Sequence, residues 1–454
     1  MAKKLTDKEF LASMSDSNSL FGNFGGAVGQ ITLANLRHAL NKDDEEVLES
    51  LAFYIDVNKP SAKGDTRVDV GGNMGMRQLW EDAAISVLMD ASGNYCPLNR
   101  DDNRFTADGE AVLNEDGTVR AEFAHADFMK IIPPTYGRVQ TVTVGATTIH
   151  RLWLSLVPLP GGYIIPQQVV GKFKCTVEGS ALRSLPGKVP TGSKTINAFF
   201  DLAQSRSKNH GLANLDFRNH LIFYMMSKYG WRDSQNCKTA DGTLVWGVGL
   251  DGTEGLGIGE TAIVNGFANQ SSVHTGETLS LGDYDGKVAV TIGNGNTCHS
   301  VNVAGFENPW GQYWEMVQGL CSVGTDVYYW RQNWMPRGTP IADTFSDVDH
   351  VLLTRAASVD ATGINIIASD KRQGVYMIPN SSLTGVSYGD NYSYGNDGQS
   401  WLFGGSSSLG TNGGLACENS NNSWSGTVGP FSSRLAYYGP LNRVTTSRFK
   451  QLAS

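Results

Sequence analysis

The sequence GFENPWGQYWEMVQGL, residues 305–320, combines a predicted tight turn with a dense group of large apolar side chains. Pro309 and Gly311 favour the turn, because proline fixes its own φ angle and glycine accepts a positive one. Glu307 and Asn308 can tie neighbouring loop backbone groups together through hydrogen bonds. The large apolar side chains are Trp310, Tyr313, Trp314 and Val317. We therefore predict that this stretch buttresses the core of the fold and binds no ligand.

Residues 387–433 have a different composition. The segments SYGDNYSYGNDGQS (387–400) and SSSLGTNGG (406–414) are rich in Ser, Asn, Tyr, Gly and Asp and hold few aliphatic residues. Antibody paratopes have this composition, because tyrosine supplies rigid contact area while the small polar residues supply adaptable hydrogen bonds. Ordinary loops are also rich in Ser, Gly and Asn, so that alternative stays open. The predicted framework of this region is Trp401, Leu402, Leu415, Arg434 and Leu435.

We predict that a ligand-binding face is formed by exposed side chains within this region. Tyrosine and tryptophan would offer flat apolar area at low entropic cost, and asparagine would offer paired donor and acceptor groups. The candidate ligand-binding residues are Tyr388, Asn391, Tyr392, Tyr394, Asn396, Ser407, Ser408, Leu409, Asn412, Asn419 and Trp424.

Several stretches resemble known families, in a consistent order along residues 78–450. The stretch 305–320 is similar to the formylglycine-generating-enzyme type of C-type-lectin fold. WLFGGSSSLGTNGGLACENSNNS (401–423) and FSSRLAY (431–437) resemble the ending of variable proteins from diversity-generating retroelements. AISVLMDASGNYCPLN (84–99) and DGTVRAEFAHADFMKI (116–131) resemble the opening of phage tail proteins that carry this domain. FGNFGGAVGQITLANLRHAL (21–40) also looks like the start of phage tail-fibre proteins.

The resemblance implies a receptor-binding protein of the phage tail-fibre type, located in the virion tail. Its variable loops would occupy the region around Ser407, Ser408 and Leu409 and would face a bacterial cell-surface receptor, either protein or glycan. Other virion tail proteins are implied as partners. A polar loop site binds weakly on its own, whereas several linked copies gain avidity of ~10²–10⁴, so we expect a homotrimer.

The chain is predicted to divide into a helical attachment or oligomerisation module (1–58), a linker (59–77) and a C-type-lectin-like domain (78–454). In the module, DDEEVLESLAFYI (43–55) places apolar residues on one helical face, with acids in the first turn. These residues are Val47, Leu48, Leu51, Ala52 and Ile55. The face would pack either on another copy or on its own chain. The Pro, Gly and Ser content of the next segment favours a linker.

The large domain is expected to be α+β, with two helices among many short strands and long loops. Strand-like runs alternate with turns over 78–119, and residues 128–176 are rich in β-branched residues. Helical spacing predicts helices near 196–209 and 215–229, stopped by Gly211 and Gly230. This order differs from the alternation of a doubly wound sheet.

Composition argues against several classes of function. The formal net charge of the 454 residues is −8, and no dense run of Lys and Arg occurs, which argues against nucleic-acid binding. The amino terminus has no apolar stretch after its lysines, so we expect no secretory signal, and no window approaches the ~20 apolar residues of a membrane span. The cysteines form no CxxC pair and are expected to be mostly buried thiols.

We also expect no catalytic residue, no metal and no cofactor. DGTEGLGIGE (251–260) lacks the lysine and the spacing of a nucleotide-binding loop. His274, His299 and His350 show no paired metal spacing, and Cys417 lacks the surroundings found in formylglycine-generating enzymes. The alternatives are a virion-associated polysaccharide depolymerase using Asp343, Asp347 and Asp349, and a structural decoration protein of the virion. The same acids would also suit a structural Ca²⁺ ion.

Overall fold

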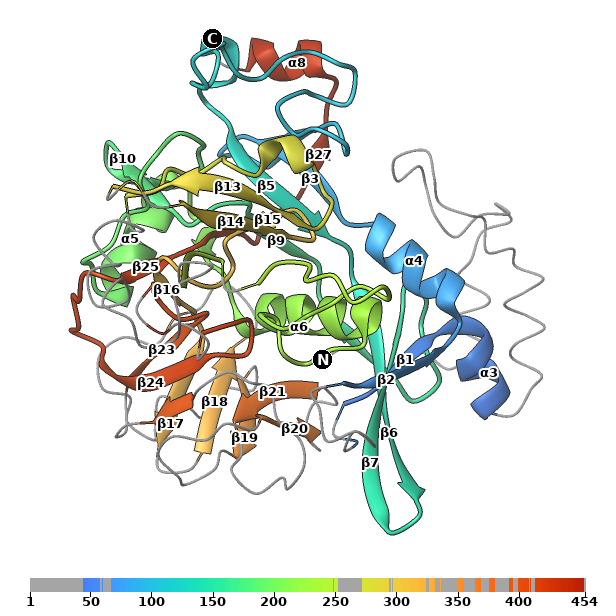
Figure 1. The fold of residues 1–454 in the computed structure, drawn as a ribbon. Coiled ribbons are helices and arrows are strands. Elements are labelled where there is room, and N and C mark those ends of the chain that lie inside the picture. The colour runs from blue at the N-terminus through green and yellow to red at the C-terminus, as the bar shows by residue number, and fades with distance from the viewer. Residues whose placement is uncertain are drawn as a thin grey trace.

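The computed structural model describes most of the chain from residue 44 onwards (Figure 1). The described residues are 44–57, 59, 67–247, 249–251, 272–293, 295, 297–323, 326–330, 335, 350–354, 364–368, 375–379, 392–394, 399–407, 409 and 413–452. They form an α+β fold in which a few helices lie among many short strands, as the sequence predicts.

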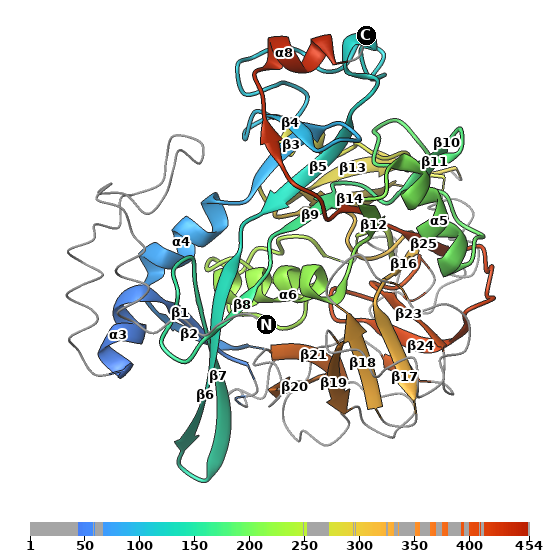
Figure 2. The same ribbon diagram turned by 180° about the vertical axis from the view of Figure 1, so that it is seen from behind.

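A five-stranded antiparallel sheet contains the first strands of the chain, in the order β2-β1-β7-β6-β8. The strands are β1 (Phe53–Asp56), β2 (Asp69–Gly72), β6 (Thr135–Val144), β7 (Thr147–Ser155) and β8 (Tyr163–Ile165). The far half of the β6–β7 hairpin extends away from the body (Figures 1 and 2), and residues 145–148 at its tip are exposed.

A seven-stranded sheet joins the middle of the chain to its carboxy-terminal part, in the order β12-β26-β9-β5-β3-β4-β27. Its strands are β3 (Ile85–Met89), β4 (Asn94–Pro97), β5 (Asp127–Ile132), β9 (Gln168–Gly171), β12 (His210–Leu212), β26 (Leu435–Tyr437) and β27 (Asn442–Arg443). The late strand β26 lies between β12 and β9, and helix α8 (Thr446–Gln451) follows β27.

A second five-stranded sheet has the order β22-β24-β23-β16-β25. Its strands are β16 (Trp314–Met316), β22 (Tyr392–Tyr394), β23 (Gln399–Phe403), β24 (Glu418–Ser423) and β25 (Phe431–Ser433). β16 pairs with both β23 and β25. This pairing brings the stretches 305–320 and 401–437 together in one sheet.

The remaining strands form smaller sheets. These are β10 (Thr176–Glu178) with β11 (Ala181–Arg183), β13 (Gly286–Thr291) with β14 (Thr297–Val303) and β15 (Phe306–Glu307), β17 (Leu320–Val323) with β18 (Asp326–Trp330) and β19 (His350–Thr354), and β20 (Ile364–Ala368) with β21 (Val375–Pro379). Three short 3-10 helices, η1 (Ala121–Phe123), η2 (Gly249–Asp251) and η3 (Leu279–Leu281), occur in the described loops.

The two predicted helices are confirmed as α5 (Ile196–Arg206) and α6 (Leu215–Tyr229). Asn214 caps α6 by accepting a hydrogen bond from the Phe217 backbone N–H at 3.1 Å. Gly230 ends the helix in the left-handed conformation, with φ of 69°. α5 ends three residues earlier than predicted, and Gly211 belongs to β12.

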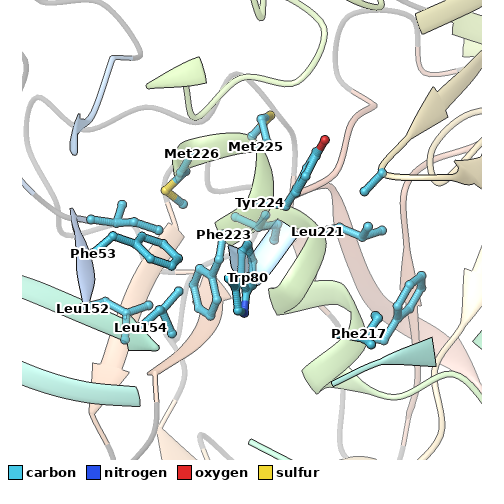
Figure 3. Packing of buried hydrophobic residues seen from close by; sticks show 14 of the residues in the cluster. Phe53, Trp80, Leu152, Leu154, Phe217, Leu221, Phe223, Tyr224, Met225 and Met226 are labelled. Carbon is cyan, nitrogen blue, oxygen red and sulfur yellow. The ribbon is translucent and has the colours of Figure 1, made fainter. Parts of the chain in front are cut away.

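Helix α6 is buried on nearly every side and lies at the centre of the molecule (Figures 1 and 2). Figure 3 shows Phe223 of α6 among apolar side chains from the first sheet and from helix α4 (Met74–Asp82). The indole of Trp80 in α4 lies 5.4 Å from the Phe53 ring and donates a 2.8 Å hydrogen bond to Thr135. The core therefore joins the earliest described elements to the centre of the chain.

The predicted boundaries at residues 58 and 77 do not divide the described structure. Helix α3 (Asp44–Leu51) carries only Val47, Leu48 and Leu51 of the predicted apolar face. Ala52 follows the helix, and Ile55 belongs to β1, which starts two residues after α3 ends. β1 pairs directly with β7, and the apolar residues of α3 belong to the same core as α6. The face therefore packs on its own chain, one of the two alternatives left open. Residues 1–43 lie outside the described residues.

The segments predicted as a linker (59–77) and as a strand-rich start of the domain (78–119) contain β2 and α4. Helix α4 forms here because Asn73 caps its amino-terminal end, a feature that composition alone does not reveal. Asn73 accepts a hydrogen bond from the Met76 N–H at 2.9 Å and donates one to the Ser50 carbonyl. The glycines of this segment allow close packing: a side chain at Gly71 would meet the Tyr54 ring at 2.5 Å. The glycines that suggested a linker are therefore positions at which the backbone packs closely against neighbouring residues.

Candidate functional site

Three of the predicted ligand-binding residues belong to strands of the sheet β22-β24-β23-β16-β25. Tyr392 and Tyr394 belong to β22, the edge strand next to β24. Asn419 is half-buried in β24, and Leu409 is partly buried against the neighbouring core. Tyr388, Asn391, Asn396, Ser408 and Asn412 lie outside the described residues.

The expectation of exposure is wrong for Ser407 and Trp424. Ser407 is fully buried, and only 6% of Trp424 is exposed. Trp424 follows β24 and folds back into the apolar cluster that contains Phe431 and Trp314. An indole gains more from burial against these rings than from exposure to water, so this residue supports the framework.

Among the described residues of this region, exposed side chains lie at the end of β24 and in the turn that follows it. Asn421 and Ser423 of β24 are exposed, as are Ser425 and Val428 after it, and Val428 presents 49% of its surface. The Asn419 side chain accepts hydrogen bonds from the Asn421 N–H at 3.0 Å and the Asn422 side chain at 2.7 Å. These bonds hold the end of β24 in shape while it presents polar groups to solvent. We call residues 419–428, together with β22, the loop face.

A buried ion cluster lies beneath this sheet, centred on Glu315 of β16. One Glu315 oxygen contacts Lys174 Nζ at 2.9 Å and Arg434 Nη2 at 2.6 Å, and the other lies 3.4 Å from Arg218 Nη1. All four side chains are at most 1% exposed. Burial would raise the pKa of Glu315, but the cations Arg434, Lys174 and Arg218 outweigh burial and lower this pKa to about 2.

Backbone carbonyls supply the remaining acceptors for the three cations. Arg434 donates to the carbonyls of Gly171, Lys172 and Glu307. Lys174 donates to Asn308, and Arg218 donates to Pro309 and Leu415. The cluster therefore joins α6, the segment after β9 and the 305–320 motif. It also reaches Leu415 and Arg434, which lie before and after residues 419–428 in the sequence.

The 305–320 motif acts as predicted, as a core buttress. Trp310 is fully buried and Trp314 is 8% exposed, which confirms the predicted burial. Glu307 accepts hydrogen bonds from the Gly276 and Thr278 N–H groups, each at 2.8 Å, and Asn308 accepts one from Val301 at 2.9 Å. Gly311 has a positive φ of 69°, as the predicted turn requires.

A second buried ion cluster lies between β3, β5 and β9. The Asp283 carboxylate lies 3.4 Å from Lys130 Nζ and 3.5 Å from Lys172 Nζ, and Lys172 donates to Ser86 at 2.7 Å. Burial lowers the pKa of Lys172 to about 7, against the opposing effect of Asp283. These side chains are almost completely buried, so the cluster ties the sheet together and offers no open position for a substrate.

The described residues contain no group of three His, Cys, Asp or Glu side chains arranged to hold a metal ion. Asp343, Asp347, Asp349 and the run 252–260 lie outside the described residues. His274 is exposed, and the six cysteines are buried thiols, as predicted. None of the helices in the described part of the chain has the length and hydropathy that crossing a bilayer requires.

Two partners in the Glu315 cluster were not predicted from the sequence. Arg218 lies within the run DFRNH, whose polar residues interrupt an otherwise apolar helix, and this interruption is the signal for a buried charge. Lys174 has no comparable local signal, because its buried position depends on where β9 lies in the sheet. Glu418 was also missed: it is buried, and burial raises its pKa well above the usual value despite the nearby Arg218.

Comparison with models of known protein families gives no match, and a search of curated proteins gives none either.

Proposed function

We propose that this protein is a receptor-binding protein of the phage tail-fibre type, whose loop face binds a molecule on a bacterial surface. The observation that carries the proposal is the position of the loop face: an exposed polar strand end with the turn after it, and an edge strand, belong to a sheet whose strand β16 is fixed by the Glu315 cluster. A rigid framework below adaptable polar loops is the arrangement that recognition surfaces use, because a preorganised site loses less entropy on binding.

We propose that the α+β fold is of the C-type-lectin-like kind. Its support is the sequence resemblance of 305–320 and 401–437 together with the pairing of β16 with β23 and β25. We propose a homotrimer located in the virion tail, since several linked copies would raise the avidity of a weak polar site by ~10²–10⁴. Sedimentation analysis of the purified chain tests the oligomeric state.

We expect the double substitution Tyr392→Ala and Tyr394→Ala to weaken binding to host cells by about 1–3 kcal/mol, roughly a 5- to 150-fold rise in Kd. The reason is that tyrosines commonly supply the rigid contact area of recognition surfaces. The measurement uses fluorescently labelled protein on a panel of bacterial strains and compares the variant with the wild type on each strain that the wild type binds.

The matched control is Tyr284→Ala, because Tyr284 is 47% exposed and lies outside the loop face. We expect this control to bind like the wild type and the double variant to keep the wild-type unfolding midpoint. If the folded double variant binds cells as tightly as the wild type, the loop face is not the receptor-binding site. The same samples incubated with capsular polysaccharide are expected to release no reducing ends.

A further inference from the structure

A second concave surface lies away from the loop face. A cavity of about 700 Å³ opens between the turn 113–119, the segment 185–188 and the segment 274–280. This volume is within the ~300–1,000 Å³ typical of small-ligand sites. We call it the polar cleft. Its lining residues lie between 104 and 188 and between 274 and 280, so it shares none with the loop face.

Hydrogen bonds between two of its walls hold the cleft in shape. Thr275 Oγ1 donates to the carbonyls of Leu185 at 2.6 Å and Lys188 at 3.0 Å, and Gly187 N–H donates to the Thr275 carbonyl at 2.7 Å. The buried Glu307 carboxylate fixes the next turn through Gly276 and Thr278. The 305–320 motif therefore positions one wall of the cleft as well as supporting the core.

Two glycines line the cleft on opposite walls. A Cβ atom built on Gly187 would lie 3.9 Å from the Gly117 carbonyl oxygen on the opposite wall. Both residues have positive φ angles, 69° and 81°. With no side chain at either position, the two walls face each other through their backbones. The N–H groups of both glycines already donate within the protein, Gly187 to the Thr275 carbonyl and Gly117 to the Asn114 carbonyl.

Charges of both signs line the cleft and largely neutralise one another. Lys188 Nζ lies 3.1 Å from Glu178, and Arg104 Nη2 lies 2.6 Å from Asp102. Asp116 accepts hydrogen bonds from the N–H and hydroxyl of Thr118. Burial raises the pKa of Glu277, and His274 opposes this shift. A polyanion would meet the carboxylates of Asp116, Glu178 and Glu277 on these walls, and a polycation would meet Arg104, Lys188 and, when protonated, His274.

The ligand chemistry that fits these walls is a neutral polyol. A sugar hydroxyl both donates and accepts, so neighbouring hydroxyls bond to the carboxylate and the ammonium of one ion pair without adding net charge. Apolar groups of Pro186, Leu113 and Val119 provide contact area for the C–H faces of a sugar ring. Apart from the His274 imidazole, no lining residue is aromatic, which disfavours stacking of a nucleobase.

We propose that the polar cleft binds a short, uncharged segment of a polysaccharide. This second site is independent of the loop face, since the two share no residue. It would add a second contact to each copy of the protein at a glycan-coated surface.

The test is a glycan array that carries neutral, acidic and amino-sugar oligosaccharides, probed with the full chain. We expect the wild type to bind neutral oligosaccharides. Ser280→Trp should raise the Kd at least about tenfold, because Ser280 is an exposed lining residue and an indole there would fill the cleft. The matched control Ser50→Trp adds the same side chain to the exposed surface of α3 and should bind like the wild type.

A second variant, Glu277→Gln, replaces a charged hydrogen-bond acceptor by a neutral amide of the same size. It should also weaken the binding of neutral oligosaccharides while keeping the wild-type unfolding midpoint. The proposal is overturned if the wild type binds no neutral oligosaccharide or prefers acidic glycans. It is also overturned if Ser280→Trp binds neutral oligosaccharides as tightly as the wild type does. The double variant Tyr392→Ala and Tyr394→Ala should keep its array binding. A failure of the loop face in cell binding is therefore distinguishable from a failure of the cleft.

Discussion

Replacing Glu315 with glutamine is expected to lower the free energy of unfolding by about 3–5 kcal/mol. The substitution keeps the shape of the side chain and removes the only carboxylate that contacts Lys174, Arg218 and Arg434 within the described residues. Three buried cations would then face only neutral acceptors, namely the glutamine amide oxygen and backbone carbonyls, and one another. Denaturant unfolding followed by tryptophan fluorescence measures the loss.

The matched control for this substitution is Glu110→Gln. Glu110 contacts Lys450 Nζ at 2.7 Å, but the two side chains are 39% and 31% exposed. Solvent screens such a pair, so its loss should cost about 0–1 kcal/mol. Equal effects of the two substitutions would show that the Glu315 cluster does not hold the framework together.

The same cluster predicts how stability changes in acid. The pKa of Glu315 is lowered to about 2 in the folded protein, below its ordinary value of 4.5. A carboxylate with a lowered folded pKa stabilises the fold fully above the unfolded pKa, and this contribution is lost as the pH falls through the folded pKa. The stability difference between wild type and Glu315→Gln should therefore shrink as the pH falls from about 5 towards about 2. A difference that grows on acidification would contradict the assignment.

Replacing Trp310 with alanine is expected to cost about 3–5 kcal/mol of stability. Trp310 is fully buried and meets Trp246 edge-on, with ring centroids 5.7 Å apart. The turn that carries it brings its backbone against Gly404, where a Cβ would lie 2.6 Å from the Pro309 carbonyl. Neighbouring atoms held this closely cannot collapse into the space that a lost indole leaves, so the cavity would persist.

Denaturant unfolding of Trp310→Ala tests this, with Tyr284→Ala as the control for the loss of an exposed aromatic ring. Host-cell binding of the folded variant should be close to that of the wild type when stability is restored by low temperature. A loss below about 1 kcal/mol would mean that this motif does not buttress the core.

Local patterns in the sequence were sufficient where a short stretch determines its own structure. Helix α6 is predicted by its apolar spacing and by Gly230, and the burial of Trp310 is predicted by the turn around Pro309 and Gly311. These features depend on residues a few positions apart. The same holds for the framework positions Trp401 and Leu435, which are fully buried as predicted.

The sequence was insufficient where the position of a residue depends on distant partners. Trp424 has the composition of an exposed loop around it, but its indole lies in a cluster built from β16 and β25. The polar cleft is lined by segments that are about 70–160 residues apart, and only the fold brings them together. The glycine-rich segment before α4 was assigned to a linker because composition cannot distinguish a flexible glycine from one required by a close contact.

The placement of β26 between β12 and β9 has a consequence for synthesis. Arg434 donates to the Gly171 carbonyl, 263 residues earlier in the chain, and β26 joins β12 to the rest of the seven-stranded sheet. At ~5–20 residues per second, a ribosome needs on the order of tens of seconds to produce the intervening chain. During that time β9 lacks its neighbour β26, and its edge is open to pairing with other chains. The seven-stranded sheet therefore closes only after nearly the whole chain has been made.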